Sequence, residues 1–310
     1  MGETTMRATY GFLAVDRARL RVRVIGEGPT IIVLHGGPDF DHFYLLPELD
    51  RLAEKFRLVY YDQRGRGRSA DGVRPKDVTL ISEMGDLDAV RSDLELETVA
   101  VLGHSWGGVL AMEYATRHPE RVSHLVLMNT APASHHDAEV FRRHLRSIRP
   151  ASEINAMDAL AASDTFRAGA LHAELDYYRL HFRPALVATD QLDRVIPRLR
   201  AHFTPERVLL ARAIEQRLYR DTWSSPTYDL LPRLHHLAVP TLLLHGEHDF
   251  IPIRLAEHIA GAIPDSRFVV LPGCGHFAYM EAPELVREQV GRLFGVSAFP
   301  SPRRAADAGP

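Results

Sequence analysis

Residues 99–118 read VAVLGHSWGGVLAMEYATRH, and this stretch decides the fold. The apolar run Val99–Leu102 is typical of a buried strand, and Val109–His118 has the composition of a helix that Pro119 ends. Between them lies the pattern G-x-S-x-G, which holds a serine in a sharp strand-to-helix turn. We therefore expect the hydroxyl of Ser105 at a helix N-terminus, where the helix dipole favours developing negative charge.

Further apolar runs resemble Val99–Leu102 and show no alternation of apolar and polar residues. They are Ile31–Leu34, Leu58–Tyr61, Leu125–Met128, Thr241–Leu244 and Phe268–Leu271. Continuous runs of this kind are typical of parallel strands that helices cover on both faces. With helical segments such as Arg254–Ile263 between them, they predict a doubly wound, mostly parallel α/β sheet. Alternating residues within Gly11–Ile25 predict an antiparallel hairpin at one edge.

The alternation of strands and helices lapses between residues 132 and 230, where helical patterns such as Leu171–Phe182 replace it. We interpret 132–230 as a helical cap inserted between two parts of an α/β core, residues 1–131 and 231–296. Insertions at this place commonly form lids over an active site. The remaining segment, 297–310, is rich in Pro, Ala and Arg and is predicted to be disordered.

Composition narrows the class of protein. Of the 310 residues, 45% are hydrophobic and 25% charged, as in an average globular protein, and the formal net charge is −3. No basic field favours nucleic acid or an anionic membrane. The one cysteine, Cys274, excludes an internal disulfide and fits a reducing compartment. Because no signal sequence and no membrane-spanning run is visible, we expect a cytoplasmic protein. The oligomeric state stays open.

A serine hydroxyl becomes an effective nucleophile only beside a base, so a histidine and a carboxylate are needed. Asp249 and His276 each follow a predicted strand, and the interval between them has room for one helix and one strand. Since parallel strands end at the same edge of a sheet, the sequence predicts a catalytic triad of Ser105, Asp249 and His276. Glu247 is the competing carboxylate, and we assign it a capping or salt-bridging role.

Other polar clusters suggest different chemistry but are discounted. His245 and His248 flank the loop of Asp249, yet a loop lacks the fixed spacing of helical zinc ligands, and no cysteine cluster accompanies them. The segment 135–137, His-His-Asp, is interpreted as a polar surface loop, and Cys274 as a small packing residue. The sequence thus predicts no metal and no cofactor.

An oxyanion formed by attack of a serine needs two preorganised N–H donors. One is expected from the residue after the nucleophile, Trp106, and the other from the first strand-to-helix loop. That loop reads HGGP over residues 35–38. Because Pro38 has no N–H group, Gly37 is the predicted second donor.

Three motifs together carry a resemblance to a known family. They are HGGP at 35–38, DQRGRGRS at 62–69 and GHSWGG at 103–108. Over about residues 10 to 296 the chain resembles the α/β-hydrolase superfamily, and within it the proline iminopeptidases and related prolyl aminopeptidases. The resemblance implies an α/β-hydrolase fold and a supporting, non-reacting role for the 62–69 loop beside the active-site entrance.

The chain departs from the pattern of that family at several places. Asp39 stands where the family usually has a glycine after HGGP, and His104 where it more often has glycine. Family members anchor the free amine of the substrate with glutamates from the cap, and by resemblance the candidate here is Glu215. The alternative for Glu215 is a helix-surface residue paired with Arg212 or Arg217.

These features predict a cofactor-independent serine hydrolase that acts on a small amide, peptide or ester through an acyl-enzyme, most like a proline iminopeptidase. An esterase, a lactonase or a ring-closing acyl-transfer enzyme of a biosynthetic pathway would use the same triad. The alternative from another class is a non-catalytic small-molecule receptor on the same fold.

Overall fold

One eight-stranded sheet organises the computed structural model, which describes residues 7–296. The spatial order of the strands is β1-β2-β4-β3-β5-β6-β7-β8. Their bounds are β1 Thr9–Val15, β2 Ala18–Ile25, β3 Thr30–Leu34, β4 Arg57–Tyr61, β5 Val99–His104, β6 Val122–Met128, β7 Thr241–Gly246 and β8 Ser266–Leu271. Each apolar run singled out in the sequence lies within one of these strands.

Strands β3 to β8 run parallel to their neighbours, whereas β1 and β2 form the predicted antiparallel hairpin at one edge. The hairpin joins the sheet through an antiparallel pairing of β2 with β4. All parallel strands therefore end at one edge of the sheet, where the loops that follow them meet. The predicted fold class is confirmed.

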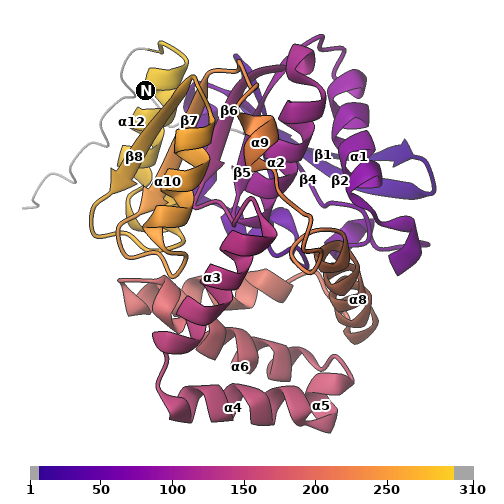
Figure 1. Cartoon of the computed structure of the whole chain (residues 1–310). Coiled ribbons are helices and arrows are strands. Elements are labelled where there is room, and N and C mark those ends of the chain that lie inside the picture. Colours follow the sequence, from indigo (N-terminus) through magenta and orange to yellow (C-terminus); the bar gives the residue numbers. More distant parts are fainter. Residues whose placement is uncertain (1–6, 297–310) are drawn as a thin grey trace, which may run out of the picture.

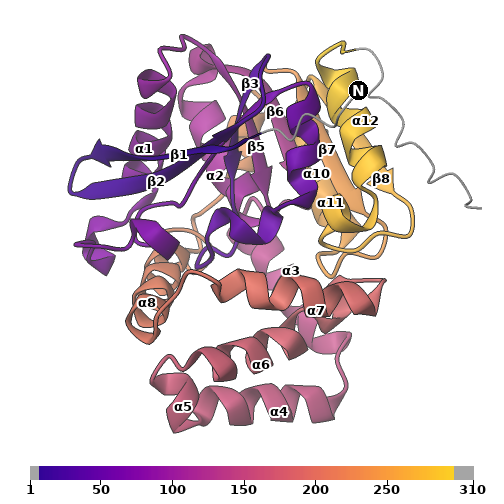
Figure 2. The ribbon, with the colours of Figure 1, turned by 180° about the vertical axis from the view of Figure 1, so that it is seen from behind.

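Helices cover both faces of the sheet and bury a hydrophobic core on each. Against one face lie α1 (Leu80–Asp93), α2 (Trp106–Arg117), α9 (Leu231–Leu234) and α10 (Ile253–Ala262), and against the other α11 (Ala278–Glu281) and α12 (Pro283–Leu293) (Figures 1 and 2). Successive side chains of a strand point to opposite faces, so Ile32 packs in the first core and Ile31 in the second.

A run of helices without an intervening strand lies between β6 and β7. Its members are α3 (His135–Ser147), α4 (Ala151–Ala162), α5 (Asp164–Arg167), α6 (Leu171–His181), α7 (Leu192–Val195) and α8 (Pro205–Asp221). We call α3 to α8 the cap helices, because Figures 1 and 2 show them gathered beyond one edge of the sheet. An isolated bridge between Ser134 and Asp229 joins the two ends of this run.

The interpretation of residues 135–137 as a loop is wrong. They form the first turn of α3, where Ser134 is the N-cap and its hydroxyl accepts a hydrogen bond from the N–H of Asp137 at 3.1 Å. A serine cap stabilises a helix start even when the residues that follow are polar. The predicted disordered segment, 297–310, lies outside the described residues. Within residues 7–296, no helix is both long and apolar enough to cross a bilayer.

Candidate active site

Ser105 occupies a sharp turn between β5 and α2. Its backbone has φ 55° and ψ −121°, a conformation that residues with a side chain rarely adopt. Glycines on both sides allow the close packing that this turn needs. A Cβ at Gly103 would lie 2.3 Å from the carbonyl oxygen of Gly107, and a Cβ at Gly107 would lie 2.2 Å from that of Leu34. Ser105 is the N-cap of α2, but its side chain makes no capping hydrogen bond, so the hydroxyl stays available for other contacts.

Asp249 and His276 meet in the loops that follow β7 and β8. Nδ1 of His276 lies 3.0 Å and 3.1 Å from the two carboxylate oxygens of Asp249. The carboxylate also accepts hydrogen bonds from the N–H of Ile251 at 2.9 Å and from the amide of Asn129 at 2.7 Å. Burial would raise the pKa of Asp249, but the charges of His276 and His245 and the hydrogen bonds with His276 and the N–H of Ile251 bring it below its ordinary value.

The competing carboxylate, Glu247, has a different partner. It is exposed, and it accepts a hydrogen bond from the N–H of Gly273 at 2.9 Å. Cys274 is buried, and burial raises the pKa of its thiol to about 11. Across the part of the chain that the structure describes, no group of three or more His, Cys, Asp or Glu side chains is arranged to hold a metal ion.

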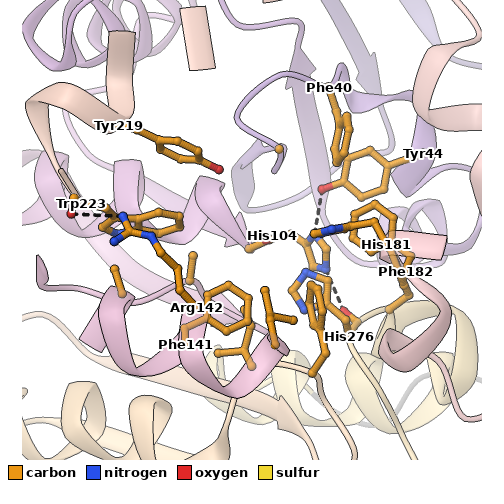
Figure 3. Close-up of a pocket in the computed structure, with 18 residues that line it drawn as sticks. Phe40, Tyr44, His104, Phe141, Arg142, His181, Phe182, Tyr219, Trp223 and His276 are labelled. Carbon is orange, nitrogen blue, oxygen red and sulfur yellow. Dashed lines mark hydrogen bonds between the residues drawn. The ribbon is translucent and has the colours of Figure 1, made fainter. Parts of the chain in front are cut away.

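A cavity of about 180 Å³ brings Ser105, His276 and Gly37 together beneath the cap helices. Most of its other lining residues are aromatic or aliphatic. Figure 3 shows His104, His276 and Phe182 on one side of this cavity and Tyr219, Trp223 and Arg142 on the other. We call it the Ser105 cavity.

The two predicted oxyanion donors lie on the expected elements, Gly37 in the loop after β3 and Trp106 in the first turn of α2. Gly37 lines the Ser105 cavity with φ at +120°, in the region that favours glycine. Trp106 is the first residue of α2, so its N–H group has no acceptor within the helix. The indole of Trp106 is fully buried and packs edge-on against Tyr219 and Trp223.

His104 connects three loops of the site through a directed chain of hydrogen bonds. Its Nε2 lies 3.0 Å from the carbonyl oxygen of His276, which can only accept, so Nε2 carries the proton. Nδ1 then accepts from the hydroxyl of Tyr44 at 2.7 Å, and that hydroxyl oxygen accepts from the N–H of Gly36 at 2.8 Å. Burial and the nearby His276 lower the pKa of His104 to about 3, which keeps this ring neutral.

Glu215 lies on α8 one turn before Tyr219, on the same face of the helix. Neither proposed partner pairs with it. Arg212 binds Glu174, and Arg217 binds Asp221. Burial, followed by the charge of Asp39, raises the pKa of Glu215 to about 8, although Tyr219, Arg200 and Arg212 act in the opposite direction.

Asp39 belongs to a buried network that reaches the cap. Its carboxylate binds the guanidinium of Arg200 and accepts a hydrogen bond from the hydroxyl of Tyr178 at 2.7 Å. Arg200 also contacts Glu174 at 2.9 Å, and Glu174 in turn binds Arg212. The residue that replaces the usual glycine is thus held by α6 and the segment before α8.

Reasoning from the sequence missed several of these residues. A signal existed for Asn129, which directly follows β6 at the same sheet edge as Ser105 and Asp249. For Tyr44 and Arg142 the sequence carries no local signal, since neither stands in a motif or at a strand end.

Comparisons with known proteins were made against families, curated proteins and solved structures. A family model described as alpha/beta hydrolase fold matches residues 29–283. The proline iminopeptidase of Lactobacillus helveticus strain DPC 4571 is 28% identical over 270 residues, which are 84% of this chain and 88% of that protein. The proline iminopeptidase PfmaB of Pestalotiopsis fici is 25% identical over 287 residues, which are 90% of this chain and 97% of that protein.

Among solved structures, the crystal structure of the proline iminopeptidase of Mycobacterium smegmatis is similar with a TM-score of 0.67 and 28% sequence identity. The match covers 93% of this chain and 98% of that one. These similarities confirm the resemblance drawn from the motifs and support a hydrolase of the α/β fold.

Proposed function

Because the chain belongs to the α/β-hydrolase fold family, we propose that it is a serine hydrolase that releases the N-terminal residue of short peptides, as its proline iminopeptidase relatives are named for doing. The observation that carries the proposal is that His276, which contacts Asp249 at 3.0 Å, lines the same cavity as Ser105. This arrangement supports the roles proposed for Ser105 as nucleophile, His276 as base and Asp249 as the acid that orients it.

In the proposed mechanism His276 takes the proton of the Ser105 hydroxyl while the oxygen attacks the carbonyl carbon of the scissile bond. The N–H groups of Gly37 and Trp106 stabilise the oxyanion of the tetrahedral intermediate. His276 then gives its proton to the leaving amine, and an acyl-enzyme remains. Water, deprotonated by the same imidazole, releases the acid and restores Ser105. Asp249 orients the ring and stabilises its protonated form.

Residues 132–230 act as a cap in this proposal, and Glu215 on α8 receives the free amine of the substrate. An ammonium group in a water-excluded pocket needs a carboxylate, because an unpaired buried charge costs several kcal/mol. The raised pKa of Glu215 fits a carboxyl group without a cationic partner of its own.

Replacement of the nucleophile tests the mechanism. Ser105→Ala should fold normally and lose on the order of 10³-fold or more in kcat on prolyl p-nitroanilide. Ser147→Ala, at an exposed serine at the end of α3, is the matched control and should behave as wild type. Retention of more than a tenth of the wild-type rate by Ser105→Ala would exclude this triad.

Two further measurements separate the alternatives. A receptor would not react with a fluorophosphonate probe, whereas the proposed enzyme should be labelled in the wild type and not in Ser105→Ala. An esterase or lactonase would hydrolyse short acyl esters and leave prolyl p-nitroanilide intact. An acyl-transfer enzyme would require a second nucleophile other than water for turnover.

A further inference from the structure

A second cavity, of about 340 Å³, lies beside the Ser105 cavity between α3, α4 and α6. The two cavities share three lining residues, Arg142, Leu145 and His181. A substrate that reaches from one into the other passes Arg142, whose guanidinium lies beside Trp223 at the wall of the Ser105 cavity (Figure 3). We call this second space the arginine cavity.

The lining of the arginine cavity is strongly biased toward positive charge. Three guanidinium groups line it, those of Arg142, Arg146 and Arg149, against one carboxylate, Asp158. Arg142 pairs with Glu139 at the surface. Among residues 7–296, Arg146 and Arg149 form no ion pair. The cavity therefore carries an excess of positive charge next to the Ser105 cavity.

Arg149 is the most enclosed of the three. One of its terminal nitrogens donates to the carbonyl oxygen of His181 at 2.5 Å, while its buried Nε has no hydrogen-bond partner in the described part of the chain. Burial lowers the pKa of Arg149, with only partial compensation from Tyr177 and Glu153. An anion that pairs with this partly buried cation would offset the cost of its desolvation and could accept a hydrogen bond from the buried Nε.

A negative charge, that of Glu215, lies near the same cavity. Tyr177 lines the arginine cavity, and its hydroxyl feels the charges of both Glu215 and Arg149. A peptide residue spans about 3.5 Å, so the two ends of a dipeptide or tripeptide are separated by only a few such steps. A carboxylate is the planar anion that a guanidinium binds through two hydrogen bonds.

We propose that the arginine cavity binds the C-terminal carboxylate of the substrate, so that the enzyme is specific for di- and tripeptides with free ends. The inference rests on the proposed function, since it places the scissile bond at Ser105. It adds a second anchor, at the leaving-group end of the peptide, and thereby selects the length of the substrate.

Blocking the carboxylate tests this proposal. Prolyl-alanine should be hydrolysed with a kcat/KM at least 10-fold higher than prolyl-alanine amide, and lengthening the peptide to six residues should cause a similar loss. In Arg149→Gln and Arg142→Gln the preference for the free acid should fall to within 3-fold. Arg149→Lys keeps the charge and should retain most of it. Arg143→Gln, also on α3 but outside the cavity lining, is the matched control and should keep the wild-type preference.

Equal rates on the acid and the amide in the wild type would overturn the proposal. So would competitive inhibition by inorganic phosphate at concentrations where acetate and free alanine have no effect, since that would assign the cavity to phosphate.

Binding to Ser105→Ala separates this proposal from the proposed function. If the wild type hydrolyses no prolyl peptide but Ser105→Ala binds the acid at least 10-fold more tightly than the amide, the function fails and the anion site stands. If prolyl peptides are hydrolysed without any preference for the acid, the function stands and the anion site fails.

Discussion

Two mostly buried charged clusters lie near the active-site edge, and they differ in whether their charges balance. The first is built on the 62–69 loop and α1. Its carboxylates are Asp62, Glu83 and Asp86, and its guanidinium groups are Arg64, Arg66 and Arg68. Each carboxylate has its own guanidinium, with Arg64 to Asp86 at 2.5 Å and Arg66 to Glu83 at 2.7 Å.

The second cluster joins the 35–41 loop to the cap helices. It holds three carboxylates, Asp39, Glu174 and Glu215, and two guanidinium groups, Arg200 and Arg212. Both guanidinium groups pair with Asp39 or Glu174, and they act on Glu215 only through their charge. One negative charge is therefore unmatched when all these groups ionise. Burial alone does not separate a structural cluster from one that receives a ligand. In our proposal the excess of one carboxylate marks the second cluster as the one that receives a ligand, because a cationic partner would offset the cost of an unpaired charge there.

Breaking the balanced cluster should have the largest effect on stability. Arg66→Met removes two bonds to Glu83, at 2.7 Å and 2.8 Å, and leaves that carboxylate buried without its partner. We expect a loss of about 3–5 kcal/mol in the free energy of unfolding, measured by urea denaturation. Arg51→Met, at an exposed pair with Glu284, should lose less than about 1 kcal/mol.

The double variant Arg66→Met/Glu83→Leu sharpens this result. Replacing both members of a buried pair with apolar residues is often close to neutral, so most of the lost stability should return. A double variant as unstable as the single one would show that Arg66 acts through its bonds to Gln63 and the 64 carbonyl group instead.

The unbalanced cluster should show the opposite behaviour, with a large effect on activity and a small one on stability. Glu215→Gln removes the charge proposed to hold the substrate amine. The kcat/KM on prolyl p-nitroanilide should fall roughly 10- to 100-fold, about 1.4 to 2.8 kcal/mol, while acyl esters without an amine stay unchanged. Glu206→Gln, exposed at the start of the same helix, is the control. Equal loss on both substrates would make Glu215 a structural residue.

The pH dependence of the same comparison follows from the pKa of Glu215, about 8. Productive binding requires an ionised Glu215 carboxylate and a protonated substrate amine, so the two groups together hold one proton. An N-terminal amine has a pKa of about 8. The ratio of kcat/KM on a prolyl substrate to that on an ester should therefore be bell-shaped with a maximum near pH 8. Any pH dependence that arises from His276 affects both substrates equally and cancels in this ratio. A flat ratio in the wild type, or an unchanged bell in Glu215→Gln, would contradict the assignment.

The smallest expected effect is on stability at high pH. The pKa of Glu215 is raised from 4.5 to about 8, so the folded chain keeps a proton that the unfolded chain loses as the pH rises above 4.5. The wild type should therefore lose stability relative to Glu215→Gln between about pH 5 and pH 8, with no further change above that. The difference should be on the order of 1 kcal/mol, since solvent screens this partly exposed side chain. Thermal unfolding at pH 5, 7 and 9 measures it.

The mostly parallel character of the sheet was predictable because a strand covered on both faces must be continuously apolar. The first and last residues of the strands were less predictable. Strand β8 begins at Ser266 and β6 at Val122, before their apolar runs, because backbone pairing with the neighbouring strand extends to residues outside those runs. Helix α3 was missed since its first residues are polar and only the cap at Ser134 marks its start.

Some residues of the candidate site were likewise predictable from the sequence, and others were not. Ser105, Asp249 and His276 could be placed because each follows an apolar run, and the geometry of a parallel sheet brings such positions to one edge. The contacts of His104 with Tyr44, or of Asp39 with Arg200, depend on segments that lie far apart in the chain and meet only in the folded protein. No local pattern encodes such pairs.

The cap run leaves and rejoins the sheet layer at a single point. Besides the bridge between Ser134 and Asp229, the N–H of His135 donates to the carbonyl of Tyr228 at 2.8 Å, and that of Leu230 to Ala133 at 3.0 Å. Two antiparallel segments in register fix the gap that any intervening sequence must close, whatever its length. Residues 136 to 227 thus enter and leave the cap through one pair of adjacent segments. The point at which the cap joins the sheet is therefore fixed by these few backbone hydrogen bonds and not by the number of residues between them.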